Sequence, residues 1–592
     1  MNMMEFSYRN VFRNIKAYAA YFISSTISAS LMFSFSMIIL HPDFNTDMFP
    51  DALKNALYVS IFIAYFFLCF FVFYSESVFL KSRYKDFGVL YIIGASRKQI
   101  KKMITIENLI ITSSAGVFGV IIGLVFSKIL IAACGRILGV TSLNFYLPVK
   151  SVLITITAFI VIGFVVSLSA SMIIKEDKVL KLLKGTRKPK AEPKFSKLLT
   201  LVSLITLITG YFLSATTTQK NFASRVIIVT SMVVVATYFI FSQVSIRIIY
   251  LLKSRKKIYM NRTKMLCISD MLYRVKDNAR MFFLITITSA VALTSIGGIY
   301  VYWNSKEAEI NSSFPQSFFI YDYYNHKDDV ERKISFIKSS LYDKKVDSNN
   351  VCGTIKYVSV KDIDDTVLVS RSTYDALKKS NSMSKYKFNE YKKKVLPAIF
   401  DDVKVVDEDV FNSTAGKKIY FTAVNVSDYK TTLDISREYL DKFNSLKRDK
   451  YSNDFLKSYI YERTKVGYGV LLFSGVFIGL VFFITTASFL YNKCYMDIIE
   501  DKQKYCNLSK IGLTSKEIKK ILNVEIGILF VLPYSVSMFH FIFAISALKS
   551  AADVLVLNVA LQVIGVMIVV QIIYYFIIRK NYIDEIKKEI II

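Results

Sequence analysis

The chain has 592 residues, of which 53% are hydrophobic, and a mean hydropathy of +0.40. Apolar runs of about 20 residues, the length that crosses a bilayer, recur along it. This composition excludes a soluble globular protein and predicts a polytopic membrane protein. The formal net charge of +30 reports membrane topology, and no nucleic-acid partner is implied.

The apolar runs predict ten spans, near 18–40, 55–75, 104–127, 151–174, 198–215, 226–252, 281–303, 466–491, 524–548 and 555–578. Basic residues gather in every second connection. The segments predicted to be cytoplasmic are 1–17, 76–103, 175–197, 253–280, 492–523 and 579–592. The positive-inside rule then predicts a multi-pass protein of the cell membrane with both termini in the cytoplasm.

The stretch 81–110 is basic although apolar runs flank it on both sides. The apolar residues of one helical face are Ile93, Ile100 and Ile104. The basic residues of another face, spaced at i, i+3 and i+4, are Lys98, Lys101 and Lys102. Gly94 suits a turn between two short helices, and Ser96 suits the N-cap of the second. Taken alone, the stretch also fits a basic juxtamembrane loop attracted to anionic lipid.

Residues 508–528 repeat residues 90–110 at a constant offset of 418, with nine of 21 positions identical. The identical pairs are Leu90/Leu508, Ile93/Ile511, Gly94/Gly512, Lys98/Lys516, Ile100/Ile518, Lys101/Lys519, Lys102/Lys520, Glu107/Glu525 and Ile110/Ile528. A generic lipid-binding loop needs basic residues but not this register. The repeat therefore predicts a duplicated transport core with two docking points for a soluble partner.

One large insertion, residues 304–465, separates spans seven and eight on the predicted outer side. It holds 29 basic and 25 acidic residues, so most of the positive charge belongs to the membrane part. Residues 327–341 have the helical stripe Val330, Ile334, Ile337 and Leu341. The predicted strands are 353–361, 365–371 and 417–426. Over 150 residues suffice for a separate core, so the insertion predicts an extracellular α+β domain.

The predicted fold is mostly α: ten transmembrane helices, built from a duplicated four-span core plus two extra spans, with the extracellular α+β domain. Five segments follow in order. They are 1–183, the first four-span repeat; 184–280, a linker with spans five and six and a cytoplasmic segment; 281–303, span seven; 304–465, the extracellular domain; and 466–592, spans eight to ten, which complete the second repeat.

No catalytic or metal-binding pattern is present in the sequence. A G-x-x-x-x-G-K-[ST] phosphate loop is missing, so this chain is not expected to hydrolyse ATP itself. The three histidines and six cysteines lack metal-ligand spacing. No metal or cofactor is therefore predicted on this chain, and it is not predicted to be an enzyme. His540, in span nine, is interpreted as a polar contact between helices.

The pattern S-R-x-K-x-F-G-x-L-x-x-I-G-A-S-R-x-Q-I, read from Ser82 to Ile100, resembles the FtsX-like permease superfamily of ABC transporters. The ten spans, the domain between spans seven and eight, and the opening FSYRNVFRNIKAYAAYFISSTIS narrow the resemblance. Together they resemble the bacitracin-resistance-type permeases of Gram-positive bacteria, which protect cells against cell-wall-directed antimicrobial peptides. The resemblance covers essentially the whole chain.

The resemblance implies that the basic stretches couple the chain to a separate ATPase, and that this partner holds the ATP and Mg²⁺. Candidate coupling residues in the first copy are Arg83, Gly88, Gly94, Ser96, Arg97, Lys98, Ile100, Lys101, Lys102 and Glu107. Those in the second copy are Gly512, Lys516, Ile518, Lys519, Lys520 and Glu525. The second copy departs from the pattern, since Asp501, Lys502 and Cys506 stand where the first has Arg83, Tyr84 and Gly88. The two docking points are therefore expected to be unequal.

The predicted partners are two copies of an ABC ATPase subunit, a membrane histidine kinase, membrane lipid, and a peptide antibiotic or lipid-linked wall precursor. The ligand is expected to bind somewhere in 304–465, but no sequence pattern identifies its pocket. The predicted function is ATP-driven mechanical release or transport of the antibiotic, together with its sensing. Two alternatives remain: a lipid or lipoprotein extractor, and a signalling or hydrolase-regulating protein with little transport.

Overall fold

The computed structural model describes most of the chain. The described ranges are 3–13, 15–42, 51–138, 146–173, 192–261, 263–322, 326–360, 363–384, 395–400, 402–443, 454–552 and 556–590. Residues 175–191 of the predicted cytoplasmic linker lie outside them. The chain forms two compact units. Unit 1 comprises Met1–Val301 and Val470–Ile592, and unit 2 comprises Tyr302–Gly469.

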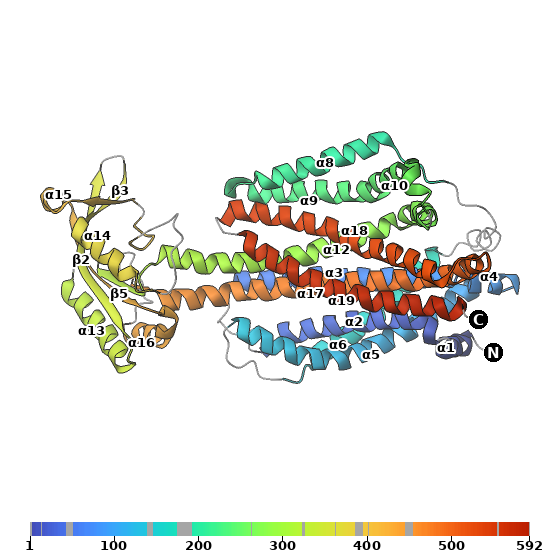
Figure 1. Cartoon of the computed structure of the whole chain (residues 1–592). Helices are drawn as coiled ribbons and strands as arrows, with labels where there is room; N and C mark the ends of the chain where they lie inside the picture. The colour runs from blue at the N-terminus through green and yellow to red at the C-terminus, as the bar shows by residue number, and fades with distance from the viewer. Residues whose placement is uncertain are drawn as a thin grey trace. The chain divides into compact units, whose positions relative to one another are not determined.

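Unit 1 is helical (Figure 1). Its helices in the first part of the chain are α1 (Met3–Arg13), α2 (Ile15–Ile39), α3 (Asp51–Ser82), α4 (Tyr84–Ile92), α5 (Arg97–Leu138) and α6 (Val149–Ile173). Those of the middle part are α8 (Lys197–Ala215), η2 (Gln219–Asn221), α9 (Phe222–Phe239), η3 (Ile240–Val244), α10 (Ser245–Ser254) and α11 (Lys256–Tyr259). The remaining helices are α12 (Lys264–Ser313), α17 (Lys457–Lys510), α18 (Ser515–Ala552) and α19 (Val556–Ile590), of which α12 and α17 continue into unit 2.

Within the described residues, ten helical stretches are long and apolar enough to cross a membrane. They lie in α2, α3, α5, α6, α8, α9 with η3 and α10, α12, α17, α18 and α19. The predicted polytopic fold with ten spans is thereby confirmed. Hydropathy and length suffice for this prediction because an unpaired backbone is so unfavourable in lipid that each span stays helical along its length.

The first repeat packs through α2, which contacts α3, α5 and α6. Gly119 and Gly123 let α5 approach α2, because a Cβ at either position would overlap residues near Ala29 or Phe33. In the second repeat the close crossing is between α17 and α12. There Gly475 and Gly479 of α17 accommodate isoleucines of α12, namely Ile296 and Ile299. Both glycine pairs therefore bring helices together, as small residues do in membrane proteins.

The two repeats meet along α2, α3 and α17. The rings of Phe35 and Phe477 stack with centroids 3.8 Å apart. Polar contacts run beside them: the hydroxyls of Ser24 and Ser488 are 2.8 Å apart, and the Asn492 amide donates to Ser75 at 3.3 Å. Such contacts suit a membrane interior, where a buried polar group needs a partner.

The extra helices α8 and α9 pack on each other and on α18. His540 of α18 joins all three, since its Nδ1 lies 2.7 Å from the Tyr211 hydroxyl and its Nε2 2.9 Å from the Thr237 hydroxyl. Both ring nitrogens are therefore occupied by contacts between helices. The interpretation of His540 as a polar inter-helix contact is confirmed.

Unit 2 is built on one six-stranded sheet in the order β4-β3-β2-β5-β1-β6. The strands are β1 (Phe318–Asp322), β2 (Ser348–Val360), β3 (Ile363–Ser370), β4 (Asp402–Val406), β5 (Lys417–Val426) and β6 (Phe455–Leu456). Neighbouring strands are antiparallel, except that β3 and β4 are parallel. The helices beside them are α13 (Lys327–Asp343), α14 (Arg371–Asn381), α15 (Glu408–Ser413), η4 (Tyr429–Thr432) and α16 (Leu433–Phe443).

Both faces of this sheet are covered. Phe318 and Ile320 pack with α13 and α16 on one face, whereas Phe319 and Tyr321 pack with α14 on the other. The alternation follows from the two-residue period of a strand. The predicted helical stripe is confirmed, since its four residues are all buried in α13: Val330, Ile334, Ile337 and Leu341. The α+β fold of the insertion is confirmed with it.

Lys457 at the edge of this fold gives unit 2 an expected pH dependence. Its side chain is 1% exposed and its Nζ lies 4.6 Å from the centre of the Tyr429 ring. Burial lowers the pKa of Lys457 from 10.5 to about 7, and Glu307 opposes this only in part. Between these two values the unfolded chain binds a proton that the folded chain lacks. The free energy of unfolding should therefore rise with pH in this window, by at most about 1.4 kcal/mol per pH unit, and stay level below it.

Urea-dependent proteolysis of unit 2 in the full-length protein, repeated across this pH window, measures the slope. Lys457→Met should flatten it. Lys338→Met, at an exposed lysine of α13, should keep it. An unchanged slope in Lys457→Met would assign the dependence to another group.

Candidate coupling sites

The first predicted docking stretch folds as two helices joined by a tight turn. Helix α4 ends at Ile92 and α5 begins at Arg97. Gly94 has a φ of +98°, a conformation that L side chains rarely adopt. Ser96 caps α5: its Oγ accepts from the Gln99 N–H at 3.3 Å, and the Gln99 side chain accepts from the Ser96 N–H at 2.8 Å. The predicted turn and N-cap are confirmed, and the pair forms a capping box.

The second stretch repeats this geometry. Helix α17 ends at Lys510, Gly512 has a φ of +105°, and α18 begins at Ser515. Thr514 and Glu517 form the corresponding capping box, with N–H to side-chain distances of 3.1 and 3.4 Å. We call residues 83–107 the first dock and residues 501–525 the second dock. The sequence offset of 418 is thus also a structural repeat.

The predicted apolar face of each dock is buried in part. Ile100 packs with Leu80 and Phe87, and Ile518 packs in the core of the second repeat. The assignment of Ile93 to this buried face is wrong, because the helical period does not continue across the turn. Ile93 is 76% exposed and its counterpart Ile511 is 83% exposed. Each dock therefore presents an apolar residue directly before its glycine, which the sequence pattern alone did not reveal.

Most of the basic candidates are exposed, as these isoleucines are. The exposed ones are Arg97, Lys98 and Lys102 in the first dock and Lys516, Lys519 and Lys520 in the second. Lys101 is half-buried, and Gly88 lies buried within α4. A surface that offers both an exposed apolar side chain and exposed cations suits a partner with apolar and acidic groups. The structure thus divides the predicted residues of each copy: most of the basic ones are exposed, whereas Arg83, Gly88, Ile100 and Glu107 of the first copy and Ile518 and Glu525 of the second are buried.

Glu107 anchors the first dock from within. Arg83 lies in the break between α3 and α4, and its Nη1 is 2.5 Å from the Glu107 carboxylate. Asn10 of α1 donates to the other Glu107 oxygen at 2.7 Å. The Arg83 guanidinium also lies over the rings of Tyr18 and Phe87. With side-chain exposures of 7% and 2%, Arg83 and Glu107 form a buried ion pair that is local to the first dock.

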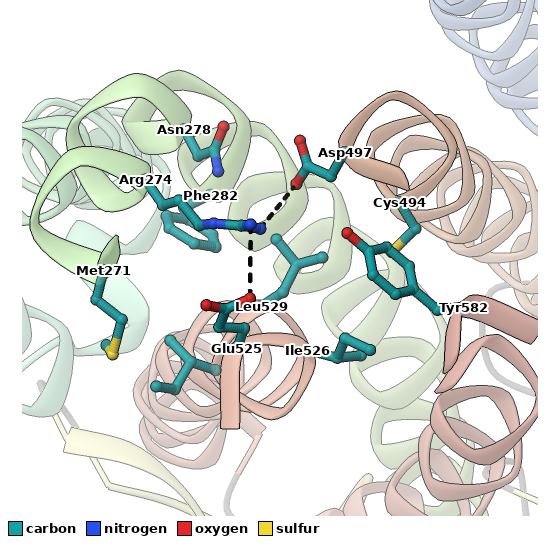
Figure 2. Close-up of a pocket in the computed structure, with 11 residues that line it drawn as sticks. Met271, Arg274, Asn278, Phe282, Cys494, Asp497, Glu525, Ile526, Leu529 and Tyr582 are labelled. Carbon is teal, nitrogen blue, oxygen red and sulfur yellow. Dashed lines mark ion pairs between the residues drawn. The ribbon is translucent and has the colours of Figure 1, made fainter. Parts of the chain in front are cut away.

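The second dock is anchored differently, because Asp501 stands where Arg83 would be. Glu525 is instead approached by Arg274 of α12, at 3.5 Å. Figure 2 shows the Arg274 guanidinium directed between Glu525 of α18 and Asp497 of α17, the latter 3.7 Å away. The same guanidinium pairs with Asp501 and, at 2.6 Å, with Asp270.

Tyrosines and a lysine complete this cluster. The Tyr505 hydroxyl donates to Glu525 at 3.1 Å, and the Tyr582 hydroxyl donates to Asp501 at 2.5 Å. Lys504 lies 2.8 Å from Asp270. Burial acts to lower the pKa of Arg274, but the surrounding carboxylates outweigh it and raise that pKa. The guanidinium is therefore held in its charged form, and the cluster ties α12, α17 and α18 together.

A duplicated helical membrane core, with an α+β domain inserted into its second copy and two matching turns at equivalent places, defines a class of two-repeat membrane permease. Residues 58–178 match the family described as FtsX-like permease C-terminal. The chain is 30% identical to the ABC transporter permease protein YxdM of Bacillus subtilis, over 99% of this chain and 100% of that protein. It belongs to the FtsX-like permeases of ABC transporters.

More distant relatives have names that state a cargo. The chain is 23% identical to the bacitracin export permease protein BceB of Bacillus subtilis, over 92% of this chain and 93% of the relative. It is 22% identical to the protein of the same name from Halalkalibacterium halodurans, over 91% and 92% of the two chains. The chain is thus a membrane permease subunit, and its relatives are not themselves catalytic.

Proposed function

We propose that this chain is the permease subunit of an ABC transporter that protects cells against cell-wall-directed peptide antibiotics. ATP hydrolysis by a separate partner drives mechanical release of the peptide from the membrane or from a lipid-linked wall precursor. Both termini and both docks face the cytoplasm, and unit 2 faces outward, where it meets the peptide. A membrane histidine kinase reads the same event. Likeness to the bacitracin export permeases supports the choice of cargo.

The duplicated dock is the observation that carries this proposal. ABC ATPases close as dimers on two nucleotides, so a permease must offer two points of contact. This single chain has two, each with a positive-φ glycine, a capping box, an exposed isoleucine and exposed lysines. The proposed complex is therefore one permease with two ATPase subunits. A homodimer of the permease would present four docks.

Native mass spectrometry tests the number of permease and ATPase subunits in the complex, after co-expression with the ATPase and extraction in detergent. One permease with two ATPases is expected. Alanine at the first dock's three lysines, Lys98, Lys101 and Lys102, should weaken ATPase capture and resistance to bacitracin. The matched control is alanine at Lys256 and Lys257, exposed lysines of α11, which should leave both unchanged. A dominant species with two permeases would contradict the stoichiometry, and undiminished capture would reassign the lysines to lipid binding.

A further inference from the structure

The two docks are anchored to different parts of the molecule. The first dock's anchor joins α1, the break before α4, and α5, through Asn10, Arg83 and Glu107. All three elements lie within unit 1. The second dock's anchor joins α18 to α12 and α17 through Arg274. Helices α12 and α17 are the two along which the chain enters and leaves unit 2.

The sequence repeat shows what has changed between the copies. At the offset of 418, Glu107 corresponds to Glu525, and Arg83 corresponds to Asp501. The first helices of the two repeats align at an offset of 264, where Asn14 corresponds to Asn278 and Lys16 to Arg280. At this offset Asn10, which donates to Glu107, corresponds to Arg274, which pairs with Glu525. The arginine that pairs with the glutamate common to both copies thus lies in the dock itself in the first copy. In the second copy it lies on α12, the helix that leads into unit 2.

The connection between the second dock and helices α12 and α17 contains more than one ion pair. Four carboxylates lie around Arg274: Asp270, Asp497, Asp501 and Glu525. Lysines add positive charge at its margins, Lys504 beside Asp270 and Lys493 beside Asp497. Asp501 and Glu525 each have a side-chain exposure of 3%. Buried like charges repel strongly in a poorly screened site, so the Arg274 guanidinium offsets the repulsion among carboxylates that three helices contribute.

We propose that the second dock is the route by which ATPase movement reaches unit 2, with Arg274 as the positioning residue. This inference rests on the proposed function, because it needs an ATPase bound at the docks. A displacement of the start of α18 pulls on α12 and α17 through Arg274, and both helices carry it along their length into unit 2. The anchor of the first dock instead joins α1, the break before α4, and α5, through Asn10, Arg83 and Glu107. The first dock serves to seat the second ATPase subunit.

Hydrogen exchange on the permease–ATPase complex, with and without ATP and vanadate, tests the route. Both docks and unit 2 should change protection in the wild type. Gly512→Val strains a turn in which an added Cβ meets no atom within 4 Å, so the packing of the helices should be preserved. It should reduce the change in unit 2 at least fivefold, whereas the equivalent Gly94→Val should reduce it less than twofold. Equal effects of the two variants would overturn the inference.

A second variant tests Arg274 itself. The double substitution R274N/D501R gives the second dock the chemistry of the first, with an asparagine at the Asn10 position and an arginine at the Arg83 position. The guanidinium introduced at position 501 would then pair with Glu525 within the dock, without engaging α12. Protection should still change at both docks, while the change in unit 2 disappears. A double variant whose unit 2 responds like the wild type would refute the role of Arg274.

The arms also separate this inference from the proposed function. If adding nucleotide changes the hydrogen-exchange protection of neither dock in the wild type, the ATPase partnership on which the proposed function depends is contradicted. If nucleotide changes the protection of both docks but not that of unit 2, the ATPase partnership is supported. The proposed route from the second dock to unit 2 is then wrong. A double variant that fails to assemble leaves the decision to the two glycine variants, which carry the same prediction.

Discussion

Replacing Arg83 by leucine is expected to destabilise the first dock by about 3–5 kcal/mol, because it leaves the Glu107 carboxylate buried without its counter-charge. Glu107 has a side-chain exposure of only 2%, and the Asn10 amide cannot neutralise it. Thermal unfolding of the purified permease measures the loss of stability. Limited proteolysis at the start of α5 should show where that loss falls.

Arg9→Leu is the matched control. Arg9 pairs with Glu5 at 2.6 Å, but the side chains of Arg9 and Glu5 are 64% and 48% exposed. An exposed pair of this kind contributes at most about 1 kcal/mol. Replacing both Arg83 and Glu107 by leucine should recover part of the loss, since no buried charge then remains in the pair. If Arg83→Leu unfolds no more readily than Arg9→Leu, the buried pair is not the anchor.

Gly94→Val is expected to abolish resistance while the protein remains folded in the membrane. At a φ of +98° a side chain costs about 1–2 kcal/mol in backbone strain, and a β-branched residue lies at the upper end. Nothing within 4 Å would clash with the new Cβ, so the effect falls on the turn and not on packing. The dock should then present Ile93 and the lysines at the wrong angle to an ATPase.

Gly565→Val is the control for Gly94→Val. Gly565 also has open space where a Cβ would be added, but it lies in α19 with no positive φ. Membrane yield and bacitracin resistance of the two variants are the measurements. Gly565→Val should match the wild type in both. Resistance retained in Gly94→Val would show that the first turn is not needed to seat an ATPase subunit.

The parts of the fold set by local pattern were predictable from the sequence. The ten spans follow from hydropathy and the cost of an unpaired backbone in lipid. Helix α13 follows from its stripe, and both turns follow from glycine before a capping residue. Strand β1, Phe318–Asp322, was missed because all five residues are buried and no polar alternation marks it. Strand β6 has two residues, too few for any pattern to register.

The anchor of the second dock could not be predicted from local pattern, because its arginine comes from far away in the sequence. Arg274 and Glu525 are brought together by the packing of α12 against α17 and α18. The repeat at offset 418 finds Glu525 but points to Asp501 for its partner, a residue of the wrong charge. Only the second, weaker correspondence between Asn10 and Arg274 could have revealed the substitution. Such compensation between distant positions is a property of tertiary structure.

The placement of the two glycine pairs shows that duplication has not produced two equal halves. In the first repeat, Gly119 and Gly123 fix α5, the helix that begins at the dock, along the length of α2. In the second, Gly475 and Gly479 join α17 to α12 and leave α18 outside that close crossing. Two closely packed helices resist bending far more than one alone. The close crossing therefore stiffens the helix that begins at the dock in the first copy, whereas in the second it stiffens the two helices that lead into unit 2.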